Sequence, residues 1–268
     1  MRFPPLPPDT RIRLSDDAAA PPPGAPSKDD AQEELHQLTK RLDERQEALY
    51  AENRRAVLVV LQGRDTAGKD GAIRKVFGPL NPQGVTVSSF KAPTAVELAH
   101  DFLWRVHQAV PPRGTIGIFN RSHYEDVLVV RVHQLVPEAV WRPRYEQINL
   151  FERILTGNKV TVLKFFLHIS REEQRERLRA RLDDPTKYWK FSAGDLGERD
   201  KWDAYTEAYE EAVRQTSTSE APWWVVPADK KYFRDLVVAQ VVTETLERMN
   251  PKYPGAPEGL AELRRRLA

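Results

Sequence analysis

The sequence predicts an α/β fold, a three-layer α/β/α sandwich built on a parallel five-stranded sheet. Short apolar runs alternate along the chain with longer segments of helical periodicity, as expected for strands that are buried on both faces and joined by helices. Three of these runs are followed by the S/T-x-x-E spacing of a helix-capping box, beginning at Thr94, Ser122 and Ser170. The five predicted strands are residues 57–61, 85–89, 115–119, 160–168 and 223–226.

A long helix is predicted before the first strand, over residues 31 to about 53. Its apolar positions recur at helical spacing between charged residues, and they are Leu35, Leu38, Leu42 and Leu49. Such a stripe packs either on the core of its own chain or on another subunit. The second alternative would make the protein a homo-oligomer, a dimer or a tetramer. Another long helix is predicted over residues 229–249.

The chain divides into three predicted parts. Residues 1–30 hold eight of the 21 prolines, which indicates an extended N-terminal arm that is ordered only where it lies on a surface. Residues 31–250 form the α/β domain. Residues 251–268 form a C-terminal tail that follows a Pro-rich connection.

The composition excludes several classes of function. Lys and Arg number 41 and Asp and Glu 39, so the net charge is only +2. This disfavours a nucleic-acid-binding surface and confines any basic site to a local patch. The absence of cysteine excludes disulfides and thiolate metal sites and is compatible with the cytoplasm. No run approaches the roughly 18 apolar residues of a membrane span, and the N-terminus lacks the apolar stretch of a signal peptide.

A phosphate-binding loop is predicted at residues 63–71, GRDTAGKDG. It lies between a buried strand and a helical pattern, which is the context of a P-loop. Glycines let the backbone N–H groups turn toward phosphate, the helix N-terminus adds a favourable dipole, and Lys69 supplies a cation. An ordinary glycine-rich turn is the alternative. The predicted phosphate-binding residues of the loop are Gly63, Ala67, Gly68, Lys69, Asp70 and Gly71.

Two carboxylates in this loop predict a metal ion. Asp70 stands where the usual P-loop has a Ser or Thr that binds Mg²⁺, and Asp65 lies within the loop itself. Mg²⁺ prefers hard oxygen ligands, so a carboxylate here can hold the ion, whereas without a metal it would repel phosphate. The predicted cofactor is therefore Mg²⁺, with Mn²⁺ as a substitute.

A second polar cluster, residues 120–126 (NRSHYED), follows the predicted strand at 115–119. P-loop proteins place an acidic residue at this strand end, whereas here it is the neutral Asn120. A helix cap would explain Ser122 and Glu125 alone, and an Arg in such a cluster can bind phosphate through its planar fork. The predicted roles are phosphate binding for Arg121, nucleotide binding for Asn120, Glu125 and Asp126, and metal binding for Asp65 and Asp126.

A helical lid is predicted over about residues 171–205. It begins with an arginine-rich helix, in which Arg177 and Arg181 are four residues apart and share one face. Residues 183–199 then interrupt the helical period with Pro and Gly, as a mobile segment does. The alternative is a solvated helix whose arginines pair with its own glutamates. We expect Arg177 and Arg181 to contact phosphate, and Lys190 to extend the positive surface.

Four motifs taken together, GRDTAGKDG, FGPLNPQG, FNRSHYEDV and WKFSAGDLGERDKW, resemble the family-2 polyphosphate kinases, P-loop proteins related in fold to thymidylate kinase. The resemblance covers about residues 31–250, and the occurrence of several motifs in one order makes it specific. It implies Mg²⁺-dependent, reversible transfer of a phosphoryl group between inorganic polyphosphate and adenine or guanine nucleotides.

The same resemblance assigns roles to individual residues. It implies that Asp65 and Lys69 are the catalytic residues of the loop, with Arg121 as a phosphate ligand. Arg177 and Arg181 would be the catalytic arginines of the lid. The pair of Asn120 and Glu125 resembles the subgroup often called class III, which accepts AMP as well as ADP, whereas other members carry Asp and then Asn at these positions.

Two other functions stay open from the residues alone. An ATP-dependent nucleotide kinase would use the same loop, although Asp70 in place of the hydroxyl disfavours it. A non-catalytic nucleotide-binding module would need a base-reading motif such as NKxD. The nearest match, residues 158–161, reads NKVT and ends in threonine.

Overall fold

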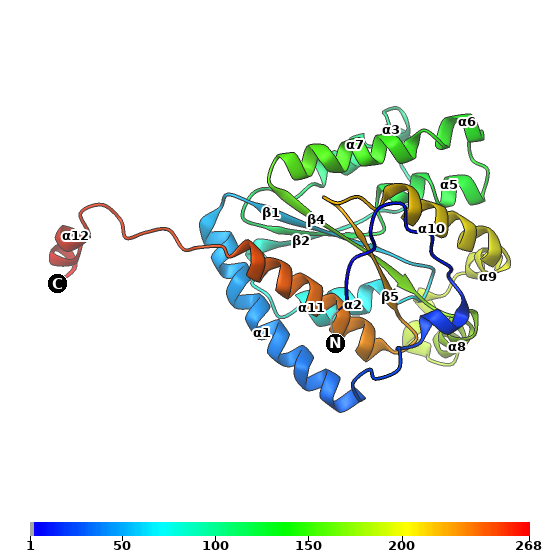
Figure 1. The fold of residues 1–268 in the computed structure, drawn as a ribbon, viewed down its shortest axis with the longest axis horizontal. Coiled ribbons are helices and arrows are strands. Elements are labelled where there is room, and N and C mark those ends of the chain that lie inside the picture. Colours follow the sequence, from blue (N-terminus) through cyan, green and yellow to red (C-terminus); the bar gives the residue numbers. More distant parts are fainter. Residues whose placement is uncertain (1–2) are drawn as a thin grey trace.

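The computed structural model describes residues 3–268, and its centre is a five-stranded sheet in the order β2-β3-β1-β4-β5 (Figure 1). Every neighbouring pair of strands is parallel. The strands are β1 Ala56–Gln62, β2 Val85–Ser89, β3 Ile116–Asn120, β4 Val160–His168 and β5 Trp223–Pro227. The predicted fold class is confirmed, and all five strands lie within one residue of their predicted bounds.

Helices cover both faces of the sheet and complete the three layers (Figure 1). The longer helices are α1 Lys28–Glu52, α7 Arg144–Gly157, α8 Arg171–Leu182, α10 Trp202–Thr216 and α11 Lys231–Met249. The shorter ones are α2 Lys69–Ala72, α3 Ala95–Leu98, α4 Trp104–Gln108, α5 Val129–Val132, α6 Glu138–Trp141, α9 Gly194–Asp200 and α12 Leu260–Leu267. Helices α1 and α11 pack on one face, and α7 and α10 on the other.

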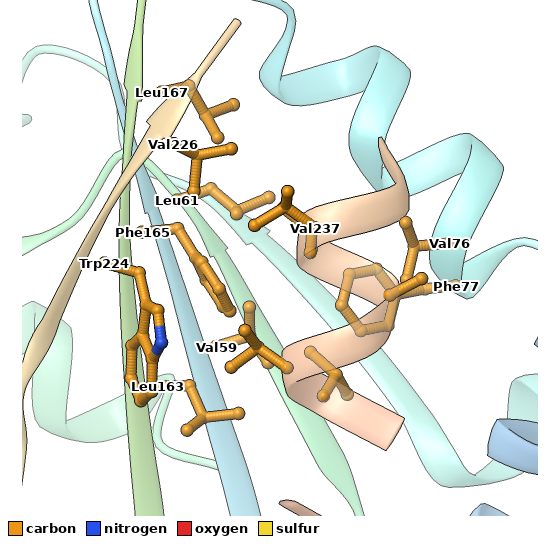
Figure 2. Close-up of a cluster of buried hydrophobic side chains, with 14 of the residues drawn as sticks. Val59, Leu61, Val76, Phe77, Leu163, Phe165, Leu167, Trp224, Val226 and Val237 are labelled. Atoms are coloured by element: carbon orange, nitrogen blue, oxygen red, sulfur yellow. The ribbon is translucent and has the colours of Figure 1, made fainter. Parts of the chain in front are cut away.

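The central strand β1 is buried along its whole length, which explains its continuous apolar sequence. Alternate side chains point to opposite faces of a strand. Val59 and Leu61 therefore join the core beneath α11, while Leu58 joins the core beneath α7 and α10. Figure 2 shows the first of these cores, in which Phe165 of β4 and Val237 of α11 lie on the same side of the sheet as Val59.

The leucine stripe of α1 packs inside its own chain. Leu38, Leu42 and Leu49 are buried in the cluster that α11 shares, and the two helices lie side by side (Figure 1). This settles the alternative that the sequence left open, so the stripe is no evidence for a subunit interface. The helix begins at Lys28 rather than residue 31, because Ser27 caps it by accepting a hydrogen bond from the Asp30 amide (3.2 Å).

The N-terminal arm lies along the edge of the sheet. The Leu6 amide donates to the Trp223 carbonyl of β5 (2.8 Å), and the Asp229 amide donates to the Ala19 carbonyl (3.1 Å). The arm thereby covers a strand edge that would otherwise expose unpaired backbone groups. Residues 1 and 2 of the predicted arm lie outside the described residues. At the other end, α12 stands apart after an extended connection (Figure 1).

The three predicted helix starts differ in detail. The capping box before α3 is complete, whereas before α8 only the Ser side chain caps the helix. After β3 the capping-box prediction is wrong, because Ser122 accepts from the Tyr124 amide (3.2 Å) and the Glu125 carboxylate binds Arg121 (3.3 Å). The segment that begins there is a single 3₁₀ turn, His123–Asp126. Among residues 3–268, no helix has the length and apolar character that crossing a bilayer requires.

Candidate active site

The candidate site lies at the carboxyl ends of β1 and β3. β1 has β3 on one side and β4 on the other, so the order of the strands reverses at this point. Open parallel α/β sheets bind ligands in the crevice outside such a switch point. Leu61 of β1 is paired with Asn120 of β3. The two polar segments that the sequence singled out, residues 63–71 and 120–126, therefore leave the sheet side by side.

The backbone path of the phosphate loop requires glycine at two positions. A Cβ added to Gly63 would lie 2.8 Å from the Leu167 carbonyl oxygen of β4. Gly68 has a φ of +99°, which L side chains rarely adopt, and a Cβ there would collide with the Arg234 guanidinium. The loop then enters α2 at Lys69. A larger residue at either glycine would displace the loop from the strand end.

Lys69 lies across the mouth of the loop and is almost fully buried. Its Nζ donates to the carbonyl oxygens of Gly63 (2.7 Å) and Arg64 (3.3 Å). Burial, reinforced by the nearby positive charge of Arg121, lowers the pKa of Lys69 to about 8. Carbonyl oxygens of the loop thus hold the ammonium group where a bound phosphate would contact it. Its lowered pKa means that it loses its proton at about pH 8.

We expect phosphate-donor use to be lost as the pH rises through about 8. Raising the pH removes the proton from Lys69 and leaves a neutral amine in the loop, so kcat/KM for the donor should fall by about tenfold per pH unit above the pKa. The measurement is a pH profile of kcat/KM. In Lys69→Arg the guanidinium stays charged, so this fall should disappear even if activity is lower. A wild-type profile that stays flat well above that pKa would contradict the assignment.

Arg121 connects the two polar segments. Its guanidinium donates to Asp65 of the phosphate loop (2.6 Å) and to Glu125 (3.3 Å). Burial alone would lower the pKa of Arg121, but Glu125 and Asp65 outweigh it and raise that pKa above its ordinary value. Arg121 also has a left-handed backbone, with φ of +61°. The side chain is therefore a fixed cation at the strand end, positioned by two carboxylates.

Asp70 and Asn120 contact each other across the same crevice. The Asn120 amide donates to the Asp70 carboxylate at 2.6 Å. A carboxylate at position 120 would instead place a like charge against Asp70, so the neutral amide is compatible with this approach. Asp65 and Asp70 both line the main cavity of the site. Mg²⁺ is usually bound by one or two carboxylates together with substrate phosphates, and these two side chains fit that requirement.

Asp126, predicted to bind metal and nucleotide, is directed elsewhere. Its carboxylate pairs with Arg144 of α7 (3.1 Å), and burial raises the pKa of Asp126 to about 6. It lines neither the main cavity nor the smaller cavity beside it. Within the described residues no cluster of three or more His, Cys, Asp or Glu side chains could hold a metal ion. Asp65 and Asp70 therefore line one cavity, whereas Asp126 lies outside it.

The main cavity is strongly cationic. It has a volume of about 620 Å³ and is lined by the phosphate loop, the end of β3, the predicted lid and the start of α11. Two carboxylates, Asp65 and Asp70, face nine cationic side chains. The nine are Lys69, Lys91, Arg121, Arg177, Arg181, Lys187, Lys190, Lys231 and Arg234. An open cavity with this excess of positive charge fits a ligand with many negative charges.

The two predicted lid arginines line this cavity but make different contacts. Arg177 donates to the carbonyl oxygens of Thr66 in the phosphate loop (2.9 Å) and Ala228 after β5 (2.7 Å). Arg181 donates to the Lys190 carbonyl within the lid (2.7 Å). Arg177 thus ties α8 to the phosphate loop, whereas Arg181, one turn later on the same helix, contacts the segment that follows α8. The predicted lid, about residues 171–205, contains α8, the 3₁₀ turn Pro185–Lys190, α9 and the start of α10.

Arg234 is a site residue that the sequence reasoning missed. It is buried in α11, is paired with Asp235 (2.6 Å), and donates to the Ala67 carbonyl (3.3 Å). Its guanidinium lies against both Gly68 and Gly71 of the phosphate loop. The sequence did contain a signal for Arg234, because a cluster of Lys and Arg follows the fifth predicted strand. The carboxyl ends of parallel strands meet at one edge of the sheet, so residues that follow this strand can reach the phosphate loop.

A smaller cavity of about 310 Å³ adjoins the main one and is lined in part by residues of α9. Asp65 and Arg121 line both cavities, so this ion pair stands between them. Glu125 lines the smaller cavity together with aromatic side chains of α10, including Tyr205 and Tyr209. The site therefore consists of a cationic chamber and a second, partly aromatic chamber that meet at one Asp–Arg pair.

A buried ion pair supports the segment that carries Arg121. Glu152 of α7 accepts hydrogen bonds from Lys164 of β4 (2.6 Å) and from the Tyr124 hydroxyl (2.7 Å), and it also contacts His123 (3.2 Å). Lys164 further donates to the Thr216 carbonyl (2.6 Å). Burial alone would raise the pKa of Glu152, but Lys164 and His123 outweigh it and hold that pKa below its ordinary value. These contacts join four elements beneath the site: α7, β4, the end of α10 and the 3₁₀ turn His123–Asp126.

The strand order, the glycine loop with its buried lysine, and the cationic cavity at the switch point define a P-loop phosphotransferase. The family model described as Polyphosphate kinase 2 (PPK2) matches residues 25–254. The chain therefore belongs to the polyphosphate kinase 2 family, a family of enzymes, and the resemblance seen in the motifs is confirmed.

Similar proteins agree with this assignment. The AMP/ADP-polyphosphate phosphotransferase of Meiothermus ruber is 57% identical over 235 residues, 88% of each chain. The ADP-polyphosphate phosphotransferase of Rhodopseudomonas palustris is 50% identical over 240 residues, 85% of this chain and 83% of the relative. The crystal structure of polyphosphate kinase 2 from Arthrobacter aurescens TC1 superposes with a TM-score of 0.90 at 44% identity, covering 93% of this chain and 90% of that one.

Proposed function

We propose that this protein transfers a terminal phosphoryl group between inorganic polyphosphate and AMP or ADP, with Mg²⁺ and in either direction. The observation that carries the proposal is the main cavity, where a P-loop and nine cationic side chains converge. Membership of the family and the names of the two relatives support polyphosphate as the donor. Because one phosphoanhydride replaces another, the reaction should be reversible.

The two chambers suggest where each substrate binds. The main cavity suits the donor phosphates, because the loop amides and Lys69 lie at its base. The smaller cavity suits the acceptor nucleotide, because the α10 aromatic side chains offer surfaces on which a base can pack. Asp65 and Arg121 stand where the two substrates would meet. The transferred group would therefore pass beside this pair.

The chain needs to supply charge and position rather than a general base. An acceptor phosphate oxygen is already ionised near neutral pH, so no proton has to be removed from it. Lys69 and Arg121 would neutralise oxygens of the transferred group, and Arg181 would close over the donor with the lid. Asp65 and Asp70 would hold Mg²⁺, which when bound neutralises phosphate charge and orients the donor.

We propose that AMP and ADP are both acceptors. The two relatives are named for different acceptors, one for AMP and ADP and the other for ADP. In this chain the neutral amide of Asn120 donates a hydrogen bond to Asp70. Glu125 lines the smaller cavity and accepts a hydrogen bond from Arg121. This is the pair of residues on which the sequence suggested the AMP-accepting subgroup.

The test is ATP formation from long-chain polyphosphate and Mg²⁺ with either ADP or AMP, in the absence of any other phosphoryl donor. Formation of ADP and then ATP from AMP would support both parts of the proposal. ATP from ADP alone would retain the polyphosphate donor and remove AMP as an acceptor. If neither acceptor gave product, the alternative of an ATP-dependent nucleotide kinase would take its place.

Asp65→Asn is expected to raise the Mg²⁺ concentration for half-maximal activity at least about tenfold, because the amide removes a charged oxygen ligand. The measurement is a magnesium titration at saturating substrates. Asp126→Asn is the matched control: Asp126 pairs with Arg144 outside both cavities, so its titration should be unchanged. A shift in Asp126→Asn with none in Asp65→Asn would move the metal to Asp126.

A further inference from the structure

We propose that a second groove, next to the main cavity, binds the part of the polyphosphate chain that lies beyond the reacting phosphates. The inference rests on the proposed function and assigns to that site a distal donor subsite. We call it the distal groove and define it by its five cationic side chains. These are Lys28, Arg74, Lys75, Lys230 and Lys231.

The distal groove adjoins the main cavity at Lys231. It has a volume of about 1110 Å³ and lies between the start of α1, the π-helical turn Ile73–Phe77 that follows α2, and the start of α11. These elements are neighbours on one face of the sheet (Figure 1). Lys231 lines both the distal groove and the main cavity. A linear chain that leaves the phosphate loop past Lys231 would therefore enter the groove.

The cations of the distal groove are free to bind an anion. Among the described residues, none of the five pairs with a carboxylate, whereas the groove's own carboxylates are all engaged. Glu173 pairs with Arg177 (2.8 Å), and Asp235 pairs with Arg234 (2.6 Å). Asp229 accepts a hydrogen bond from the Ser170 amide (2.8 Å). The positive side chains thus form no ion pair with the three carboxylates of the groove, which are held by other partners.

The chemistry of the groove fits a chain of phosphates. Four of the five cations are lysines, which act as point charges and need no fixed geometry to bind successive phosphate oxygens. Contacts spread along the groove would add to those at the loop, so affinity should rise with chain length and weaken with salt. A donor too short to reach past Lys231 would gain nothing from the groove.

The experiment compares donors of defined length, from tripolyphosphate to chains of about 100 phosphates, in the wild type and in Lys75→Ala/Lys230→Ala. In the wild type we expect the KM per donor chain to fall as the chain becomes longer. Each of the two exposed cations should contribute about two- to fivefold to the affinity for long chains. Removing both should therefore raise the KM for long chains about tenfold in the variant. The KM for the shortest donor used and kcat should stay within about twofold.

Lys40→Ala is the matched control, because Lys40 is an exposed lysine of α1 that does not line the groove. Its KM values should follow the wild type at every length. The distal groove is ruled out if the double variant also follows the wild type, or if short and long donors weaken equally. If the wild type transfers no phosphoryl group from polyphosphate of any length, it is the proposed function that fails.

Discussion

Lys69→Ala is expected to reduce kcat/KM for phosphoryl transfer by at least about a thousandfold while the protein stays folded. The ammonium group lies across the phosphate loop on the carbonyl oxygens of Gly63 and Arg64, where bound phosphates would gather. A preorganised charge in such a buried position stabilises the transition state far more than an exposed one. Steady-state kinetics with long-chain polyphosphate and ADP measure the loss.

The fold should tolerate this change, because alanine removes a buried charge and leaves the α2 backbone intact. Circular dichroism and thermal unfolding would verify that the variant is folded. Lys69→Arg, which keeps the charge on a bulkier group, should retain more activity than Lys69→Ala. Near-normal turnover in a folded Lys69→Ala protein would show that this loop does not hold the donor.

Glu152→Gln is expected to lower the free energy of unfolding by about 3–5 kcal/mol, because it leaves the Lys164 ammonium buried without its charged partner. For a chain of this size that corresponds to a fall in Tm of roughly 10 °C. The carbonyl oxygen of the introduced amide could still accept a hydrogen bond from Tyr124, so the loss should come mainly from the unpaired charge. Thermal and denaturant unfolding provide the measurement.

Two further variants separate the buried charge from other effects. Adding Lys164→Met to Glu152→Gln removes the uncompensated ammonium and should recover part of the stability. Glu172→Gln breaks an exposed pair with Arg175 on α8 and should change stability by less than about 1 kcal/mol. If Glu152→Gln destabilised the protein no more than Glu172→Gln, the buried pair would not support the fold in this way.

The sequence predicted most of the fold because the signals for strands are local. The run VLVVL at 57–61 is apolar throughout, as expected of a strand buried on both faces. The segment at 160–168 carries Lys164 within such a run, yet the strand forms, because Glu152 and Thr216 supply partners for the ammonium group. The apolar pattern thus predicted the strand correctly, although the residues that allow Lys164 to be buried lie on other elements.

Contacts between distant segments could not be predicted in the same way. The S-x-x-E spacing at Ser122 matched a capping box, but Arg121 draws the Glu125 carboxylate away from the helix end. The acidic Asp126 suggested a metal ligand from its position after a strand. In the fold Asp126 pairs with Arg144 of α7, and local sequence periodicity does not predict this contact between separate elements.

The sequence by itself determined the class of fold, the phosphate loop and the family, because strand periodicity and glycine-rich loop chemistry are written in consecutive residues. The tertiary structure alone decided which charges meet. It brought Arg234 and Lys231 of α11 to the cavity at the phosphate loop, and it paired Asp65 with Arg121 between two chambers. The physical reason is that charge interactions depend on distance in space, and only the packing of helices on both faces of the sheet sets those distances.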